Sequence, residues 1–137
     1  MVFKNGSQIK AIASNESAGR SEALSLLIID EAAFIDKIDT IWTAAQQTLA
    51  TGGQCLAIST PNGVGNWFHK TWVDAKDELN KFNTVKLHWT CHPERDQEWR
   101  DEQTKNLGPS QAAQECDADF LSSGRSVVDP AILEWYK

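Results

Sequence analysis

The hydrophobic and polar positions along the first half of the chain follow a strand–helix–strand pattern. Residues 26–29, Leu-Leu-Ile-Ile, form a continuous apolar run without alternation, which predicts a strand buried on both faces. Apolar residues then recur at helical spacing over residues 38–49, and Gly52-Gly53 is expected to end that helix. A second buried strand is predicted at residues 54–59. This spacing fits one right-handed parallel crossover.

The sequence also predicts where the first helix begins and which elements precede and follow this strand–helix–strand unit. Asp39 or Thr40 is the predicted N-cap of the first helix. The remaining predictions are a hairpin turned by Asn5-Gly6, a helix from Gly65 to Leu79, a strand at Thr84–Trp89, a helix at Glu94–Leu107 stopped by Gly108, a shorter helix at Pro109–Phe120 with Ala112, Ala113 and Cys116 inward, and a turn at Ser122–Arg125.

Two adjacent carboxylates, Asp30 and Glu31, end the first strand. Ligands of open α/β sheets lie outside the carboxyl ends of the strands, so these side chains are placed where a nucleotide would bind. An apolar strand followed by Asp-Glu is the pattern of a Walker B motif: Asp30 would hold Mg²⁺ and Glu31 would orient the water that attacks the γ-phosphate. The alternative is an ordinary strand end, where an acidic residue caps the following turn.

Hydroxyl and amide side chains follow the second strand in Ser59, Thr60 and Asn62. In a parallel crossover they emerge at the same sheet edge as Asp30, where they could sense the γ-phosphate or its attacking water. The turn chemistry of Pro61-Asn62-Gly63 is the competing explanation. Arg20 lies in a polar stretch and is a candidate for a phosphate or DNA contact, with a solvated loop arginine as the alternative.

Composition narrows the class of protein. The 137 residues amount to about one domain, and the net charge of −6 argues against a broad nucleic-acid-binding face. Three scattered cysteines form neither a disulfide framework nor a zinc site and are typical of reduced thiols in an intracellular protein. The sequence contains no G-x-x-x-x-G-K-[ST] phosphate loop, so the Walker B pattern stands without a Walker A.

Taken together, these motifs resemble the large terminase subunit of tailed bacteriophages, the ATPase motor that packages DNA into proheads. The resemblance covers nearly the whole chain. The residues that carry it, in order, are Asn5-Gly6-Ser7, Arg20, Leu27–Ile35, Ser59-Thr60-Pro61-Asn62-Gly63, Trp67-Phe68, His88-Trp89-Thr90, Pro93, Trp99-Arg100 and Phe120-Leu121-Ser122-Ser123-Gly124.

The resemblance implies a fold and a role for each matching residue. The implied fold is α/β and P-loop NTPase-like, of the additional-strand type: a mostly parallel sheet flanked by helices, incomplete because the Walker A strand is absent. Asp30 would be the Mg²⁺ ligand, Glu31 the catalytic glutamate, and Ser59, Thr60 and Asn62 the coupling motif. Residues 1–125 would be a partial ATPase domain, and residues 126–137 the start of a linker toward an absent nuclease domain.

The resemblance also implies cofactors and partners. The cofactors are Mg²⁺ and ATP in the complete domain. The partners are double-stranded DNA, the portal and the small terminase subunit, and the protein would act in the host cytoplasm and would not be secreted.

The missing strand would lie between residues 54–59 and Thr84–Trp89. The chain alone is therefore expected to close the gap with its own Thr84–Trp89 strand or to fill it with a second copy, which would give a homo-oligomer. Alone it is also expected to bind ATP weakly and to be inactive. The alternatives are a helicase-like superfamily 2 NTPase fragment and a non-enzymatic assembly module.

Overall fold

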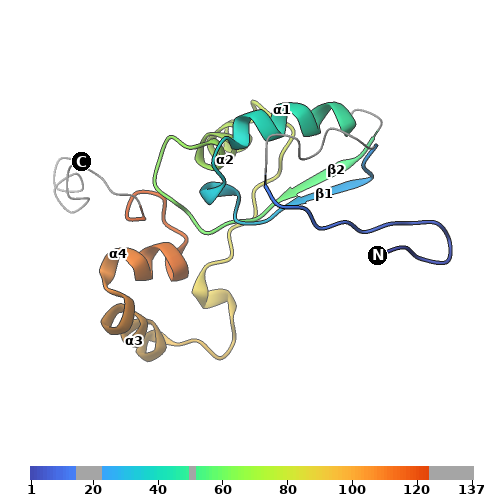
Figure 1. Ribbon diagram of the computed structural model, residues 1–137. Coiled ribbons are helices and arrows are strands. Elements are labelled where there is room, and N and C mark those ends of the chain that lie inside the picture. Colours follow the sequence, from blue (N-terminus) through green and yellow to red (C-terminus); the bar gives the residue numbers. More distant parts are fainter. Residues whose placement is uncertain (15–22, 50–51, 124–137) are drawn as a thin grey trace. The chain divides into compact units, whose positions relative to one another are not determined.

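The structure is a computed structural model that describes residues 1–14, 23–49 and 52–123. The chain divides into two compact units, and Figure 1 follows it through both. The first unit comprises Met1–Ile29 and Ile35–Leu56, and the second comprises Asp30–Phe34 and Ala57–Lys137. Helices and a small parallel sheet together confirm the predicted α/β class.

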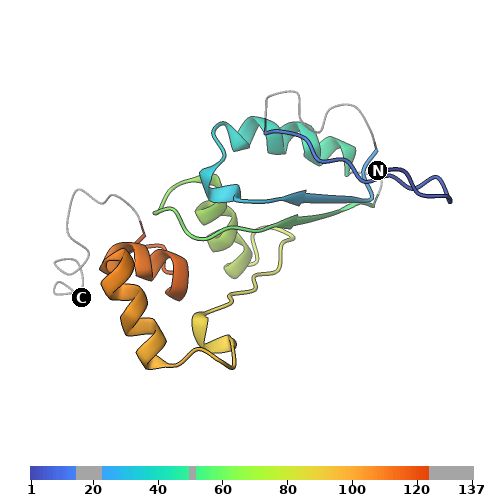
Figure 2. The same cartoon turned by 60° about the horizontal axis from the view of Figure 1, so that its bottom comes forward.

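Two parallel strands and the helix between them form the centre of the first unit. Strand β1 spans Leu26–Ile29 and strand β2 spans Gln54–Ala57, and the two are neighbours in one sheet. Figure 2 shows that both strands run in the same direction. The N–H of Gln54 donates to the carbonyl of Ser25 at 3.0 Å, which pairs Ile28 with Leu56 on one face. The predicted parallel crossover is therefore present.

Helix α1, Ile38–Thr48, supplies the core on one face of this sheet. Its buried residues Ile38, Ile41 and Ala45 are joined in the core by Ile29 of β1. The N–H of Leu24, just before β1, donates to the carbonyl of Thr48 at 3.3 Å, so the helix end is tied to the strand start.

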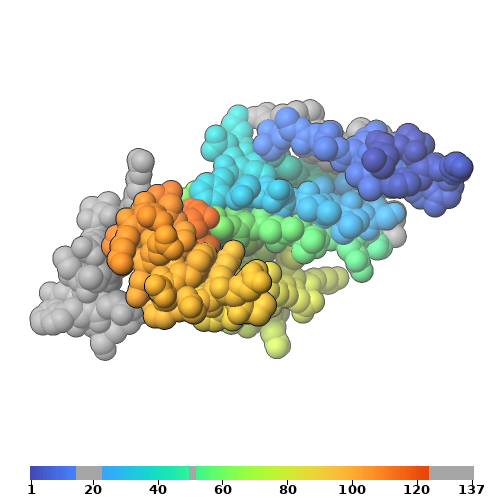
Figure 3. All heavy atoms as spheres, turned by 90° about the horizontal axis from the view of Figure 1, so that it is seen from below, coloured from blue at the N-terminus to red at the C-terminus, as the bar shows by residue number. Residues whose placement is uncertain are grey.

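The prediction that β1 is buried on both faces is wrong. Leu26 is 53% exposed, Ile28 is 56% exposed and Leu56 on β2 is 49% exposed. In Figure 3 the two strands, pale blue and green, lie side by side with their atoms visible on this face. An unbroken apolar run needs a layer on each side of the sheet, and the described residues of this unit provide a layer on one side only.

Helix α1 begins differently from the prediction and ends as predicted. The N-cap is Lys37, in the left-handed region at φ 56°, and no side chain caps the helix, so the prediction of Asp39 or Thr40 is wrong. At the other end the prediction is confirmed, because Gly52 adopts φ 99° beyond the last turn. Gly53 is needed for space, since a Cβ there would lie 2.1 Å from the carbonyl oxygen of Leu24.

The N-terminal residues make the predicted turn with little pairing around it. Gly6 adopts φ 85°, and Val2 and Gln8 form an antiparallel bridge. The N–H of Phe3 donates to the carbonyl of Ser7 at 2.8 Å and that of Ile9 to the carbonyl of Met1 at 2.9 Å. The Asn-Gly signal thus predicted the turn, but no full strands form beside it among the described residues.

Helices dominate the second unit. The elements among its described residues are a 3₁₀ turn at Ala32–Phe34, helix α2 at Trp67–Lys76, a 3₁₀ turn at Trp89–Cys91, helix α3 at Gln97–Leu107, helix α4 at Pro109–Ala112 and a π-helical turn at Ala113–Asp117. Asp96 caps α3 by accepting from the N–H of Trp99 at 2.9 Å, so the helix begins after this residue and not at Glu94. Gly108 ends it at φ 84°, as predicted.

Leu79, residues 84–89 and the predicted helix Pro109–Phe120 also differ from the sequence prediction. That helix is replaced by α4 and the π-helical turn, which ends at Asp117. Leu79 lies beyond the end of α2 and is 74% exposed, so it is not part of an apolar helix face. The predicted strand at Thr84–Trp89 is absent: Val85 and Leu87 are 73% and 75% exposed, and the sheet in the described residues contains β1 and β2 alone. A strand needs a neighbour for its backbone hydrogen bonds, and no described segment pairs with residues 84–88.

Aromatic and small residues form the core of the second unit. The ring of Phe120 lies 5.0 Å from that of His69, 5.9 Å from Trp72 and 6.1 Å from Phe68, all on α2. Ala112 and Cys116 are buried, as predicted, whereas Ala113 is only half-buried. The segment at Phe120 is therefore packed directly on α2.

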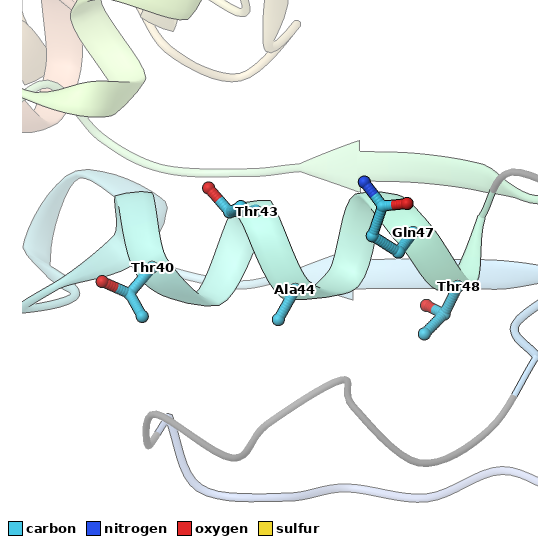
Figure 4. Close-up of a pocket in the computed structure, with 5 residues that line it drawn as sticks. All are labelled: Thr40, Thr43, Ala44, Gln47 and Thr48. Atoms are coloured by element: carbon cyan, nitrogen blue, oxygen red, sulfur yellow. The ribbon is translucent and has the colours of Figure 1, made fainter.

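One surface hollow of the first unit carries no assignment. A hollow of about 520 Å³ lies beside α1 and is lined by Thr40, Thr43, Ala44, Gln47 and Thr48 (Figure 4). These side chains include no acid, base or thiol. Within the described ranges, no helix has the length and apolar character needed to cross a bilayer.

Candidate functional site

Asp30 and Glu31 stand directly after β1, in a tight turn that belongs to the second unit. One carboxylate oxygen of Asp30, Oδ1, accepts from the N–H of Glu31 at 3.1 Å, and both residues are exposed. Glu31 adopts φ 51°, a conformation that costs a residue with a Cβ about 1 kcal/mol or more. Strained backbone of this kind concentrates at functional sites.

Ala33, in the 3₁₀ turn that follows, is held by two side chains from the end of β2. Its N–H donates to the hydroxyl oxygen of Ser59 at 3.1 Å, and its carbonyl accepts from the side-chain amide of Asn62 at 3.2 Å. A third bond runs between backbones, from the N–H of Ala32 to the carbonyl of Ile58 at 3.0 Å. Because Ala32 and Ala33 are buried, these bonds satisfy groups that would otherwise lose their water partners.

The loop after β2, Ser59–Gly63, is fixed on its other side as well. The side-chain amide of Asn66, the N-cap of α2, donates to the carbonyl of Asn62 at 2.8 Å, and its Oδ1 accepts from the N–H of His69 at 2.9 Å. The N–H of Gly63 donates to the hydroxyl of Ser123 at 3.0 Å in a buried contact. We call Ser59–Gly63 the coupling loop from here on, after the coupling motif that the resemblance implies for these residues.

The predicted site residues gather as the strand order implies. The turn bearing Asp30 and Glu31 and the loop bearing Ser59 and Asn62 meet at the same edge of the parallel pair. Thr60 lies half-buried in the same loop. The Ser59 hydroxyl and the Asn62 amide bind the backbone of Ala33, a contact that the sequence did not predict. Arg20 lies outside the described residues.

Sequence reasoning missed Ser123 and Asn66 as partners of the coupling loop. Asn66 could have been found as a helix N-cap, since Asn directly precedes the apolar start of α2. Ser123 had a weaker signal: it belongs to a run that contributed to the family resemblance, but no spacing rule connects it with Gly63, 60 residues earlier.

The donor set at the turn is compatible with a partial Mg²⁺ site. Mg²⁺ in nucleotide sites is bound through one or two carboxylates, together with waters and phosphate oxygens. Asp30 offers an exposed carboxylate of which one oxygen accepts a backbone hydrogen bond. Within the described ranges, no group of three or more His, Cys, Asp or Glu side chains is arranged to hold a metal. Asp30 thus fits as one ligand of a site completed by other groups.

An ion pair in the second unit joins α3 to the π-helical turn. Arg100 donates from Nε and Nη2 to the two carboxylate oxygens of Asp117, at 2.7 and 2.6 Å, and His88 lies 3.7 Å from the same carboxylate. The hydrogen bond from Arg100 lowers the pKa of Asp117 below its usual value. Arg100 is only 13% exposed, so this bidentate pair ties two elements together.

Comparison with known proteins identifies the class. Residues 1–129 match the family described as "Terminase large subunit, T4likevirus-type, N-terminal". The chain belongs to this family. The match favours a terminase over the helicase-like alternative.

Two relatives show how much of such a protein the chain represents. The chain is 36% identical over 93 residues to "Mu-like prophage FluMu protein gp28" of Haemophilus influenzae, a match that covers 66% of this chain and 18% of that protein. It is similar in structure to "Thermus Phage P74-26 Large Terminase ATPase domain", with a TM-score of 0.57 and 27% identity over 74% of this chain and 46% of that one. The chain thus spans less than half the length of either relative.

Proposed function

We propose that this chain is part of the ATP-hydrolysing motor of a phage DNA-packaging terminase large subunit. In this proposal Asp30 binds Mg²⁺, Glu31 is the catalytic carboxylate, and Ser59, Thr60 and Asn62 form the coupling motif. The single observation that carries it is the meeting of the two strand ends, where Ser59 and Asn62 hold the backbone of the turn that bears the carboxylates. Family membership and the similarity to a terminase ATPase domain support the same function.

The turn geometry suits the two carboxylates for different tasks. Asp30 receives the N–H of Glu31 on one oxygen, which fixes its orientation at the strand end. When bound there with ATP, Mg²⁺ would neutralise charge on the β- and γ-phosphate oxygens. Glu31 is exposed, so its carboxylate can orient a water and accept its proton.

The coupling role rests on the shared backbone of Ala33. A shift of the coupling loop alters the bonds from Ser59 and Asn62, and these bonds position the turn that carries Glu31. Hydrogen bonds at 3.1 and 3.2 Å lose their geometry when the partners separate by roughly half an ångström. The loop and the catalytic turn are therefore expected to move together when the γ-phosphate is lost.

Family membership supports a proposal for the larger assembly. The complete protein would act on double-stranded DNA together with a portal and a small terminase subunit, in the host cytoplasm. Residues 1–125 would be the ATPase part and residues 126–137, outside the described ranges, the start of a linker. The phosphate-binding Walker A loop, which this sequence lacks, would have to come from elsewhere in the complete protein.

The experiment that tests this function is the Mg²⁺ dependence of ATP hydrolysis by the complete protein that carries this region. Asp30→Asn keeps the shape of the side chain and removes the charge, so we expect a higher Mg²⁺ requirement and turnover lower by about 10²-fold, the scale of lost charge stabilisation. The control is Asp36→Asn, an exposed carboxylate outside the turn. If neither the complete protein nor its Asp36→Asn variant hydrolyses ATP, the non-enzymatic assembly module replaces our proposal.

A further inference from the structure

Ser123 connects the coupling loop to the segment that follows the π-helical turn. Among the described residues it is the one buried polar or charged residue, at 7% exposure. Its hydroxyl oxygen accepts from the N–H of Gly63 at 3.0 Å, and the same hydroxyl donates to the carbonyl of Phe120 at 3.1 Å. The hydroxyl therefore joins two backbone segments that lie about 60 residues apart in the sequence.

The Phe120–Ser123 turn is itself firmly attached to its surroundings. Asp119 accepts from the N–H groups of Leu121 and Ser122, each at 3.2 Å, and Ser110 at the start of α4 donates to the carbonyl of Ser122 at 2.6 Å. The ring of Phe120 packs against α2. A displacement of Ser123 thus carries the surrounding turn with it.

The coupling loop is consequently held from two directions at adjacent residues. Asn62 binds the carbonyl of Ala33, next to the catalytic turn, and Gly63 binds Ser123. Because these bonds leave consecutive residues, a movement of the loop large enough to change the first changes the second. The contacts form a continuous series from the turn of Glu31 to the Phe120–Ser123 turn.

We infer that Ser123 is a positioning residue that transmits movement of the coupling loop to the Phe120–Ser123 turn, and so couples hydrolysis to movement of DNA. This inference rests on the proposed function. It adds a role for a residue that does not belong to the coupling loop. Ser123 acts through Gly63 and Phe120, so its loss should affect the use of ATP energy more than the chemical step.

The test uses the complete protein that carries this region and compares Ser123→Ala with Ser122→Ala. Ser122 is a matched control, because its hydroxyl bonds to the Asp119 carboxylate and does not contact Gly63. The first readout is amide hydrogen exchange at Gly63. Loss of a buried hydrogen bond changes a local equilibrium by about 5- to 30-fold, and we expect exchange to rise by that factor in Ser123→Ala only.

The second readout is the amount of DNA moved per ATP hydrolysed. We expect it to fall about fivefold or more in Ser123→Ala, with the Michaelis constant for ATP unchanged, and to stay at the wild-type value in Ser122→Ala. If Ser123→Ala does not fold, Ser123→Cys keeps the shape with a weaker donor and acceptor, and should show an intermediate change in both readouts.

Separate outcomes decide the two proposals. Equal DNA movement per ATP in Ser123→Ala and Ser122→Ala would overturn the inference about Ser123 and leave the ATPase proposal intact. A wild-type protein that hydrolyses no ATP would overturn the proposed function. The coupling role of Ser123 would then fall with it, regardless of the amide hydrogen exchange rate measured at Gly63.

Discussion

The N–H of Ala33 donates to the hydroxyl of Ser59 at 3.1 Å across 26 residues of sequence. This bond joins the turn after β1 to the loop after β2, and the Asn62 amide adds a second bond to the carbonyl of the same residue at 3.2 Å. Both polar groups of one buried backbone unit are thus satisfied by side chains of the coupling loop. The relationship links the fold to the proposed chemistry, because the turn also carries Asp30 and Glu31.

Removing the Ser59 hydroxyl should destabilise the fold. Ser59→Ala leaves the buried N–H of Ala33 without its partner, which costs about 1–3 kcal/mol of unfolding free energy. Combination with Asn62→Ala should cost less than the sum of the two, since both side chains bind one residue. Urea denaturation measures each value. The control is Ser25→Ala, at an exposed serine. A Ser59→Ala variant as stable as this control would show that the hydrogen bond to Ala33 does not stabilise the fold.

Replacing Glu31 with glycine should separate stability from function. Glycine adopts the observed φ of 51° without strain, so Glu31→Gly should be within about 1 kcal/mol of the wild type in unfolding free energy, or above it. ATP turnover by the complete protein should be lost, since glycine has no carboxylate. Glu78→Gly is a matched control, because Glu78 adopts φ 59°. It should change the unfolding free energy by a similar amount and leave ATP turnover intact. Turnover retained in Glu31→Gly would remove Glu31 from the catalytic role.

The sequence predicted the part of the fold that local patterns determine. The apolar run before Asp30, the spacing of α1 and the Gly52 stop located the parallel crossover, and the crossover in turn predicted that Ser59 would emerge beside the Asp30 turn. These signals depend on residues close together in the chain. The functional roles of Asp30, Glu31, Ser59, Thr60 and Asn62 remain predictions.

The failures involve interactions with distant partners. The run 84–89 alternates like a strand, but no described segment offers it hydrogen bonds, so it forms none. Leu26 and Ile28 are as apolar as buried residues, yet their exposure depends on a covering layer that no local pattern encodes. The contact between Gly63 and Ser123 likewise requires the packing of Phe120 on α2, which the sequence did not reveal.

The ion pair between Arg100 and Asp117 should make stability depend on pH. The hydrogen bond lowers the folded-state pKa of Asp117 below the ordinary value of 3.8, so its stabilisation is complete above about pH 4 and is lost as the pH falls through the lowered pKa. A double-mutant cycle with Arg100→Gln and Asp117→Asn should give a coupling of about 1–3 kcal/mol at pH 7 and a smaller one at pH 3. Equal coupling at both pH values would contradict this assignment.

The chain by itself should self-associate. Thr84–Trp89 does not extend the sheet, and Leu26, Ile28 and Leu56 leave an apolar face exposed beside strand edges that can pair with another chain. Light scattering should report a dimer or a larger assembly. Ile28→Lys with Leu56→Lys places charges on this face and should shift the protein toward the monomer. A wild-type chain that is monomeric at micromolar concentration would show that this face does not associate.

The central claim is that Glu31 is the catalytic carboxylate of a terminase ATPase, and single-turnover ATP hydrolysis by the complete protein tests it most directly. Glu31→Gln keeps the size of the side chain but cannot accept a proton, so we expect nucleotide binding to be retained and hydrolysis to fall by about 10²-fold or more. Glu78→Gln, an exposed glutamate with the same backbone conformation, should hydrolyse ATP at the wild-type rate. Hydrolysis by Glu31→Gln at a rate close to that of Glu78→Gln would contradict the claim.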